Sequence, residues 1–426
     1  MKATFTKAVC YQAEATCLTP LRTAGADAET ESVLLDSHGH AMVQGSSIAG
    51  ALRGWLHSRE PDLVLPLFGS QEAGGALIVS DGVFSEDADR SMRPRLRIDG
   101  KTGAAYIEKK GSKSKGGKFD VMHVNAGSVF NFTLTCLGCD DVNANAARIE
   151  RMLAAMDRGE IVLGAQKTNG FGRVSLQVER RMFDMTDAAD REVWLDDRWD
   201  GTPLTLPKED GGDEVLFTLS GTIDGILVKS GQIRIEDGKS VTPNLKEGGR
   251  SILPGSSVKG AVRARARLIA DAMGLEGDIV SRVFGDMPRD GEALAGRVRF
   301  EDATLEENKL RVSRIRINKF TGGVMRGGLF TEEPLSGEVT LRVRVPMSCP
   351  EGCALVLYAL RDLGLGLYNL GSGGSIGRGF FQGAALSAET PDGRKLSLSF
   401  HKDGTVVADD PAALAAEWRN AWEVTA

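Results

Sequence analysis

The chain has 426 residues, 42% of them hydrophobic, which is too long for one average domain and sufficient for two with separate cores. No stretch approaches the roughly 20 apolar residues of a membrane-spanning helix, the first residues lack the apolar run of a secretory signal, and six cysteines are too few for a disulfide scaffold. The net charge of −6 argues by itself against a nucleic-acid-binding protein, and the composition excludes a membrane-spanning, fibrous or disordered chain and predicts a soluble protein of the cytoplasm.

The pattern of apolar residues predicts the same order of elements twice along the chain. Apolar and polar residues alternate in the first segment of each half, as in half-buried strands, and recur at helical spacing after each Gly-Ser-Ser sequence. In chain order, we expect a strand at Val9–Cys17, a helix at 48–56, a strand at Ala76–Phe84 and a helix at 149–156 in the first half. In the second half we expect a strand at Val215–Val228, a helix at 258–273, a strand at Arg297–Ala303 and a helix at 355–363. This β-α-β-β-α-β order predicts an α+β fold with two tandem ferredoxin-like or RRM-like domains.

Four sequence landmarks occur twice in the same order, about half the chain apart, which predicts a tandem duplication. The pairs are Gly45–Arg53 with Gly255–Arg263, Phe68-Gly69 and Gly82–Phe84 with Phe284-Gly285 and Arg299–Asp302, Ile98–Gly103 with Ile317–Gly323, and Gly170–Arg173 with Ser375–Gly379. The stretch between the halves is acidic and rich in proline and glycine, as domain connections are. We therefore expect a first domain over 1–183, a linker over 184–213 and a second domain over 214–426.

The end of the chain contains Trp418 and Trp422, four residues apart on an expected helix. We favour a helix that caps the second domain, and a docking surface is the alternative.

Each repeat contains a Gly-Ser-Ser sequence at the expected start of a helix, followed by an arginine about two turns later. Hydroxyl groups and backbone N–H groups at a helix N-terminus form an anion site suited to phosphate. An ordinary N-cap by one of the serines, after a tight glycine turn, is the alternative. The residues concerned are Ser46, Ser47 and Arg53 in the first repeat and Ser256, Ser257 and Arg263 in the second.

Basic residues concentrate in three stretches that fall on corresponding landmarks of the two repeats. Arg250–Arg267, which includes Lys259, has five basic residues and no acidic one, Lys309–Arg326 has six and none, and Lys101–Lys118 has six and only Glu108. A charged run is usually a solvated face, but the repetition predicts a groove that follows an RNA backbone. We expect Lys109–Lys118 to be a hairpin tip and Lys319–Gly323 its counterpart. Aromatic residues make up only 6% of the chain, so backbone and shape recognition should dominate.

Together these motifs resemble those of the RAMP superfamily of CRISPR systems, and in particular the backbone subunit of type III effector complexes. The second repeat carries Gly-Ser-Ser-x-Lys-Gly from Gly255, Arg-Phe-x-Asp-Ala from Arg299, Asn-Lys-Phe-Thr-Gly-Gly from Asn318, and Gly-Arg-Gly-Phe from Gly377. The likeness covers 214–383 with specific motifs and 7–176 with weaker ones. In the first repeat Ala49 replaces the lysine, and Lys101-Thr102-Gly103 lacks the phenylalanine and the second glycine. The duplication then implies two fused subunits.

The resemblance implies binding of CRISPR RNA, a β-hairpin thumb in each domain that displaces a nucleotide, and other effector subunits as partners. It also implies cleavage of single-stranded target RNA, with Mg²⁺ or another divalent cation, by an acid in the loop before the Gly-Ser-Ser helix. In the second repeat this acid is Asp237, with Glu236 beside it. In the first repeat we favour Asp27 over the other acids of the loop, which are Glu29, Glu31 and Asp36. An Asp-Gly hairpin turn is the alternative explanation of Asp237.

The residues expected to contact RNA combine the motif positions of both repeats. They are Ser46, Ser47, Arg53, Lys101 and Arg173 in the first repeat, and Ser256, Ser257, Lys259, Arg263, Lys319, Phe320, Thr321 and Arg378 in the second.

Three further expectations concern metals and competing functions. Cys136-x-x-Cys139 and Cys349-x-x-x-Cys353 have ligand-like spacing, but they fall at equivalent places in two domains, so we expect no zinc site. A scaffold that binds guide RNA without cutting is the first alternative function. A stand-alone ribonuclease that processes precursor RNA is the second.

Overall fold

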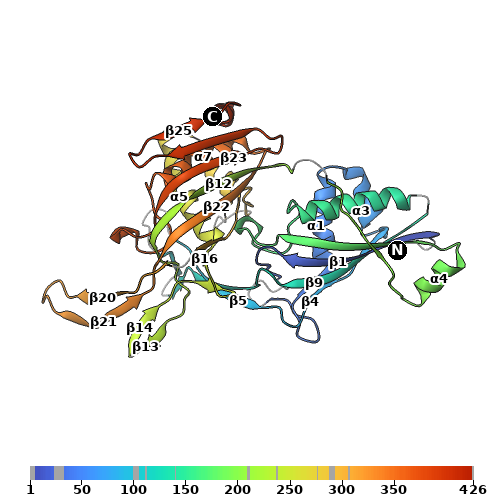
Figure 1. Cartoon of the computed structure of the whole chain (residues 1–426), viewed down its shortest axis with the longest axis horizontal. Helices are drawn as coiled ribbons and strands as arrows, with labels where there is room; N and C mark the ends of the chain where they lie inside the picture. Colours follow the sequence, from blue (N-terminus) through green and yellow to red (C-terminus); the bar gives the residue numbers. More distant parts are fainter. Residues whose placement is uncertain are drawn as a thin grey trace. The chain divides into compact units, whose positions relative to one another are not determined.

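The computed structural model describes residues 5–23, 33–98, 105–110, 113–139, 141–208, 212–236, 238–275, 277–286, 293–305 and 308–424. The chain divides into two compact units (Figure 1). The first contains Met1–Ser91, Met122–Lys167 and Phe171–Gly212, and the second contains Met92–Val121, Thr168–Gly170 and Asp213–Ala426. Among helices in the described part of the chain, none combines the length and hydrophobicity required to cross a bilayer.

The first unit is an antiparallel sheet whose two longest helices pack against one face. Its elements are β1 (Lys7–Cys17), β2 (Met42–Val43), α1 (Gly45–His57), η1 (Pro61–Leu63), α2 (Val64–Phe68), β3 (Leu77–Val79), β4 (Gly82–Phe84), β9 (Val129–Gly138), α3 (Val142–Asp157), β10 (Val174–Asp184), α4 (Ala188–Leu195) and β11 (Thr202–Pro203). The strand order is β11-β10-β1-β9-β4-β2, and β3 also pairs with β9. Tyr11 of β1 is fully buried and donates to the Ala146 carbonyl of α3, so the odd-numbered side of β1 faces the helices.

The second unit repeats this plan and extends it. Its elements are β12 (Glu214–Ile226), β13 (Arg234–Glu236), β14 (Lys239–Thr242), β15 (Lys246–Glu247), β16 (Arg250–Leu253), α5 (Gly255–Met273), α6 (Ile279–Phe284), β17 (Arg299–Phe300), β18 (Ala303–Leu305), β19 (Asn308–Lys309), β22 (Leu335–Pro346), α7 (Pro350–Gly364), η3 (Gly374–Ile376), β23 (Phe380–Glu389), β24 (Lys395–Phe400), β25 (Val406–Asp409) and α8 (Leu414–Val424). The strand order of its main sheet is β17-β22-β12-β23-β24-β25.

The four principal strands of the two units have the same order in space. In the first unit they run β10-β1-β9-β3, and in the second β23-β12-β22-β17. The helices α2 and α6 both end at a glycine, Gly69 and Gly285, as the Phe-Gly match predicted. The mixed α+β architecture and the duplication are therefore confirmed.

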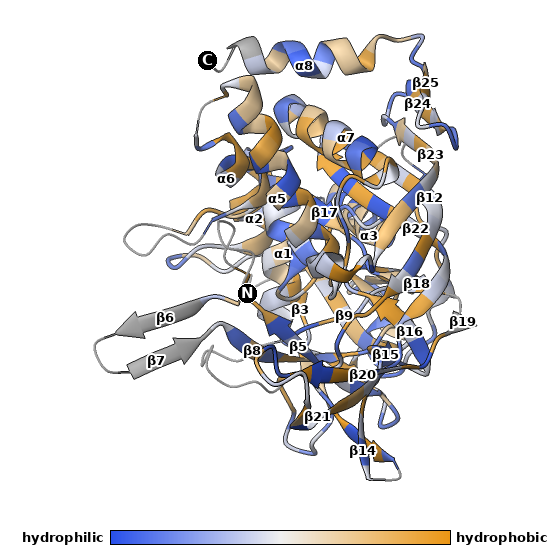
Figure 2. Cartoon of the chain, turned by 90° about the vertical axis from the view of Figure 1, so that its left-hand side faces the viewer, coloured by the Kyte–Doolittle hydropathy of each residue, from blue (hydrophilic) through white to orange (hydrophobic). Residues whose placement is uncertain are grey.

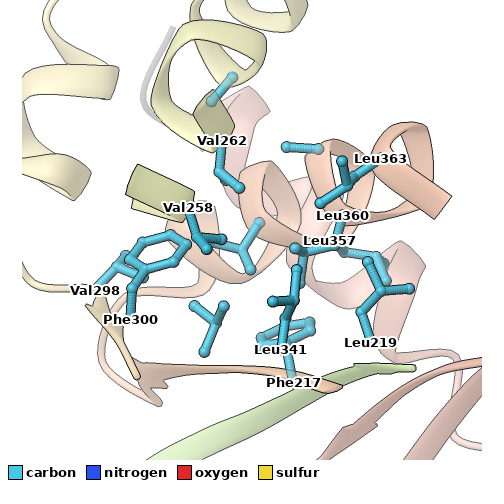
Figure 3. Close-up of a cluster of buried hydrophobic side chains, with 14 of the residues drawn as sticks. Phe217, Leu219, Val258, Val262, Val298, Phe300, Leu341, Leu357, Leu360 and Leu363 are labelled. Carbon is cyan, nitrogen blue, oxygen red and sulfur yellow. The ribbon is translucent and has the colours of Figure 1, made fainter. Parts of the chain in front are cut away.

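Apolar side chains of the sheet pack against two helices in the core of the second unit (Figure 3). Phe217 and Leu341 meet Val258 of α5 and Leu357 of α7, and all four are at most 3% exposed. The last helix, α8, alternates hydrophilic and hydrophobic segments along its length (Figure 2). Its Trp418 lies 5.5 Å from Phe217, between ring centroids, so the tail is a capping helix, as favoured from the sequence.

Two domain boundaries differ from those expected. Most of the proposed linker 184–213 is part of the first unit, because α4 packs Trp194 against Phe183 and β11 pairs with β10. Conversely, Met92–Val121 belongs to the second unit although it lies in the first repeat. The composition of 184–213 revealed its acidic surface. It did not reveal the apolar side chains that pack this segment against the rest of the first unit.

Candidate RNA interface

Each repeat contains a β-hairpin inserted before the third principal strand. The first insertion comprises β5 (Arg90–Leu96), β6 (Ile107–Lys110), β7 (Lys113–Gly116) and β8 (Lys118–Val124). The second comprises β20 (Val312–Ile317) and β21 (Val324–Glu332), which extend from the second unit beside β13 and β14 (Figure 1). The strand pairing of β6 with β7 agrees with the hairpin tip expected at Lys109–Lys118.

The two insertions share a pattern that the sequence analysis counted only as positive charge. Arg95-Leu96-Arg97-Ile98 corresponds to Arg314-Ile315-Arg316-Ile317. Neighbouring residues of a strand face opposite sides, so each strand presents arginines on one side and aliphatic side chains on the other. These four aliphatic side chains are about half exposed. The alternation of arginine and aliphatic residues along the sequence was the signal that could have revealed this pattern.

An aromatic ring supports one arginine of each pattern. The Arg97 guanidinium lies 4.4 Å from the Tyr106 ring centroid, and that of Arg316 lies 5.6 Å from the Phe330 centroid. Stacking of this kind holds a guanidinium in place while its edge stays available for hydrogen bonds.

The tip of the second insertion is a turn organised by Asn318. Its Oδ1 accepts hydrogen bonds from the backbone N–H groups of Phe320 (2.9 Å) and Thr321 (3.3 Å). The Phe320 side chain is 87% exposed, and the Lys319 Nζ lies 4.9 Å from its ring centroid. The expected residues Lys319, Phe320 and Thr321 are thus together on an exposed turn, whereas Lys101 lies outside the described residues.

A buried arginine holds the first insertion to the second unit. Arg93 of β5 is 2% exposed and its guanidinium bonds to both carboxylates of the pair Glu247 and Asp302, with Nη2–Oδ2 of Asp302 at 2.6 Å. Burial by itself would lower the pKa of Arg93, but the hydrogen bonds to Glu247 and the charge of Asp302 raise it above its ordinary value. The guanidinium therefore stays charged and fixes β5.

The second insertion is held by an ion pair in which the hairpin contributes the carboxylate and not the arginine. Glu332, at the end of β21, accepts from Arg378 Nη1 at 2.7 Å, and Arg314 Nε lies 3.5 Å from the same oxygen. Arg378 is only 7% exposed, so this residue, expected at the RNA surface, instead ties the glycine-rich loop to the hairpin.

The Gly-Ser-Ser helices begin two to three residues earlier than predicted, at Gly45 and Gly255. The N-caps are Gln44 and Pro254, with no side-chain cap, so the serines lie inside the first turn and not at the N-cap. The reason is a carboxylate from the adjoining strand region, because Gly45 N–H donates to Asp81 Oδ1 and Gly255 N–H donates to Asp302 Oδ1, each at 2.7 Å. The match of Gly82–Phe84 with Arg299–Asp302 is accordingly wrong, since Asp81 and Asp302 are equivalent.

This cap changes the expected phosphate cradle. One N–H group of each helix is already bound to a negative charge, which disfavours a phosphate at that atom. The hydroxyl groups of the two repeats differ in access, because Ser46 and Ser47 are exposed whereas Ser256 and Ser257 are half-buried. Arg53 is exposed as well.

Lys259 and Arg263 lie on the first two turns of α5. Lys259 Nζ donates to Thr168 Oγ1 at 2.9 Å, and Arg263 Nη2 lies 3.4 Å from Asp286 Oδ1. Burial, followed by the charges of Arg263 and Arg95, lowers the pKa of Lys259 to about 8. The sequence pointed to the lysine but gave no sign of its neighbour Arg95.

The glycine-rich loops of the two repeats match in a register two residues from the one expected. Gly172 and Gly379 have φ of 90° and 70°, and each carbonyl accepts from a leucine N–H, that of Leu163 and that of Leu370. Arg173 therefore corresponds to Phe380, and Arg378 corresponds to Phe171. Arg173 is half-buried immediately before β10.

Both proposed catalytic aspartates, Asp27 and Asp237, lie outside the described residues. Beside the second, Glu236 and Lys239 pair across a hairpin, and Gly238 has φ of 72°. In the first loop Asp36 accepts from the backbone N–H groups of His38 and His40, which lowers its pKa against the effect of desolvation. Within the described ranges, no group of three or more His, Cys, Asp or Glu side chains could hold a metal ion.

The comparisons with known proteins agree with the repeat. A model of the RAMP superfamily matches residues 14–175 and 230–382, which is more than half of the chain and one region in each repeat. The chain therefore belongs to the RAMP superfamily.

Two further comparisons concern curated proteins and solved structures. The search of curated proteins found no match. Among solved structures, the chain is similar to a chain of a structure described as type III-B Cmr-beta bound to cognate target RNA, with 16% identity and a TM-score of 0.33. The match covers 42% of this chain and 62% of that one.

Proposed function

We propose that this RAMP protein is a backbone-type subunit of a type III CRISPR effector complex in the cytoplasm, where it binds CRISPR RNA beside other subunits. The observation that carries the proposal is the occurrence of two RAMP regions, each with an inserted hairpin that carries the same Arg-aliphatic-Arg-aliphatic strand. Guanidinium groups on one side suit phosphates, and aliphatic groups on the other suit nucleobases. The strand order of both units supports the ferredoxin-like interpretation.

The exposed tip of the second insertion supports a role in separating nucleotides. Phe320 is held by the Asn318 turn in full contact with solvent, so its ring is available to stack on a base without rearrangement of the hairpin. Target RNA paired to a guide would be interrupted at this point, as the family resemblance implies.

For target cleavage we propose Asp237 and Asp27 with Mg²⁺. Attack by a ribose 2′-OH on the neighbouring phosphate needs in-line geometry, a proton acceptor and neutralisation of charge. A loop carboxylate would accept the proton, and the divalent ion would supply the neutralisation when bound.

Two measurements test the proposal. The purified protein should carry RNA, seen as raised absorbance at 260 nm, and with guide and Mg²⁺ it should cut labelled complementary RNA. Asp237→Ala and Asp27→Ala should each remove cleavage at one position, and the double variant should remove both. Asp403→Ala, which alters another Asp-Gly turn between β24 and β25, is the matched control and should cut normally.

A guide-binding scaffold without nuclease activity is the second candidate. It is favoured by the pairing of Glu236 with Lys239, because a two-residue hairpin turn alone would explain Asp237-Gly238. Cleavage that survives the double variant would contradict the catalytic assignment, and RNA binding without cleavage by the unaltered protein would support the scaffold. Cutting in the absence of guide would indicate a stand-alone ribonuclease.

A further inference from the structure

A hollow of about 560 Å³ lies in the open face of the first unit's sheet. The helices α1 and α3 cover the other face (Figure 1), where Tyr11 of the central strand β1 reaches α3. Neighbouring residues of a strand face opposite sides, so Gln12 and Glu14 point away from the helices and into the hollow. Strand pairing places two rows of side chains across its floor, which are Gln177, Glu14 and Asn131, and Pro203, Glu179, Gln12 and Thr133.

The side chains of this floor are polar and carry only negative charge. Gln12, Asn131 and Gln177 supply amide groups, and Glu14 and Glu179 supply carboxylates. Within the described part of the chain, no lysine or arginine lines the hollow, and Glu14 forms no ion pair. The amide groups and the Glu14 carboxylate are exposed although they lie on inner strands of the sheet, so they are available to a ligand.

The two carboxylates are placed to share one cation. Glu14 pairs in register with Gln177, two residues before Glu179, so the glutamates are diagonal neighbours with Cα atoms about 7–8 Å apart. The indole N–H of Trp199 donates to one oxygen of Glu179 at 2.6 Å, which fixes this carboxylate and leaves its other oxygen for a ligand. A planar guanidinium has donors on more than one edge and can bond to both glutamates.

The surroundings of the hollow are acidic as well. The segment 184–200 contains seven acidic residues and two arginines, for a net charge of −5. Its helix α4 packs at one end of the same sheet face, because Trp194 contacts Phe183, whose register partner is Ala8 of β1. A negative field of this kind repels RNA phosphates and attracts basic groups.

We propose that this hollow binds an arginine side chain of a partner protein. The five N–H donors of a guanidinium match a floor of carboxylate and amide oxygens better than the three of an ammonium. The charge disfavours an RNA strand, so the occupant is a basic protein segment. The inference goes beyond the proposed function and does not depend on it, because the RNA contacts are assigned to the insertions and the Gly-Ser-Ser helices.

The open face of the second unit differs. Its central strand β12 places Thr218 and Ser220 there, and Thr218 pairs in register with Arg342, which is exposed. A positive side chain therefore lies on this face of the second unit. The acidic floor is a feature of the first unit and not of the repeated fold.

The first test measures binding of a labelled peptide of alternating glycine and arginine to the full chain by fluorescence anisotropy. Glu14→Gln and Glu179→Gln should each weaken binding roughly tenfold, because each removes one charged acceptor. Glutamine at position 179 can still accept the hydrogen bond of Trp199, so the loop before β11 stays in place. Melting temperatures should show that both variants fold.

The matched control is Glu192→Gln. It removes an equal charge from an exposed position on α4, outside the hollow. An exposed charge at that distance from the bound arginine should change the affinity by less than about twofold.

The second test changes the ligand and then fills the hollow. A peptide with citrulline in place of arginine has the same shape without the charge and should not bind, and a glycine–lysine peptide should bind several-fold more weakly. Gln12→Arg places a guanidinium of the chain itself between the two glutamates. It should abolish binding of the arginine peptide and raise the melting temperature, although its change in net charge equals that of Glu192→Gln.

The outcomes separate this proposal from the proposed function. If Glu192→Gln weakens binding as much as Glu14→Gln does, or if the citrulline or lysine peptide binds as well as the arginine peptide, the arginine site is wrong. If Glu14→Gln and Glu179→Gln instead lose affinity for a single-stranded oligonucleotide, this face serves RNA and the proposal is overturned. A failure of the unaltered protein to bind RNA would contradict the proposed function and leave the peptide results unchanged.

Discussion

The two inserted hairpins present similar chemistry to solvent but are held by ion pairs of reversed arrangement. In the first, the arginine is on the hairpin and the carboxylates are on the body, as Arg93 meets Glu247 and Asp302. In the second, the carboxylate is on the hairpin and the arginine on the body, as Glu332 meets Arg378. The exposed aliphatic residues are common to both hairpins and the means of attachment is not, which indicates that the exposed face is the functional one.

The largest effect is expected from the loss of the first attachment. Arg93→Met leaves two carboxylates buried without their cation and should lower the free energy of unfolding of the second unit by about 3–5 kcal/mol. Urea denaturation followed by tryptophan fluorescence measures it, and Trp418 and Trp422 are the two of the five tryptophans that lie in the second unit. Arg378→Met should cost less, because Arg314 remains near Glu332. Equal losses from Arg93→Met and the exposed control Arg90→Met would show that the ion pair does not hold the hairpin.

Substitutions at Gly172 and Gly379 test whether the two glycine-rich loops are equivalent. Each has positive φ, and an added Cβ would overlap the carbonyl oxygen of Leu163 or Leu370. Alanine at either position should therefore lower the free energy of unfolding by about 3 kcal/mol, and the loss should be similar in both repeats. Gly393 also has a positive φ, of 82°, but has open space around it, so Gly393→Ala introduces backbone strain alone. It should lower the free energy of unfolding, measured by thermal unfolding, by about 1 kcal/mol. A large difference between the two loop variants would contradict the corrected register.

The exposed tip distinguishes the second hairpin and should affect RNA without affecting the fold. Phe320→Ala is expected to reduce affinity for single-stranded RNA by about 1–3 kcal/mol, the value of one lost base stack. Its melting temperature should be unchanged, since the ring is 87% exposed. Fluorescence anisotropy with a labelled oligonucleotide tests this, and Leu329→Ala on the same hairpin is the control for general disturbance.

The smallest expected effect is a gain in RNA affinity. Ala49→Lys gives the first repeat the lysine that the second already has, and should strengthen RNA binding by less than about 1 kcal/mol at low salt. The benefit should vanish at high salt, and Ala49→Gln should show none of it. Tighter binding by the glutamine variant would mean that packing, not charge, is responsible.

Periodicity and repetition predicted the fold well because they reflect burial. The alternation in Val9–Cys17 and the helical spacing in 355–363 record which side chains face the core, and the structure confirms β1 and α7 there. The helix starts could not be placed, since Asp81 and Asp302 reach Gly45 and Gly255 from distant parts of the sequence. The linker was misjudged for a similar reason, because Trp194 finds its partner only in three dimensions.

The site was predicted in part. Lys319, Phe320 and Thr321 form a local turn, and local sequence is enough to indicate one. Arg378 could be recognised as a motif residue but not as a buried one, since its partner Glu332 is 46 residues away. Arg93 was missed because it meets Glu247 and Asp302 only after a segment of one repeat joins the unit formed by the other.

The assignment of Met92–Val121 to the second unit means that the two halves cannot be obtained by dividing the gene at its midpoint. An N-terminal fragment would carry Arg93 without its acceptors, and a C-terminal fragment would keep Glu247 and Asp302 as unneutralised carboxylates. Each half of a divided chain would therefore lack ion-pair partners that the intact chain provides.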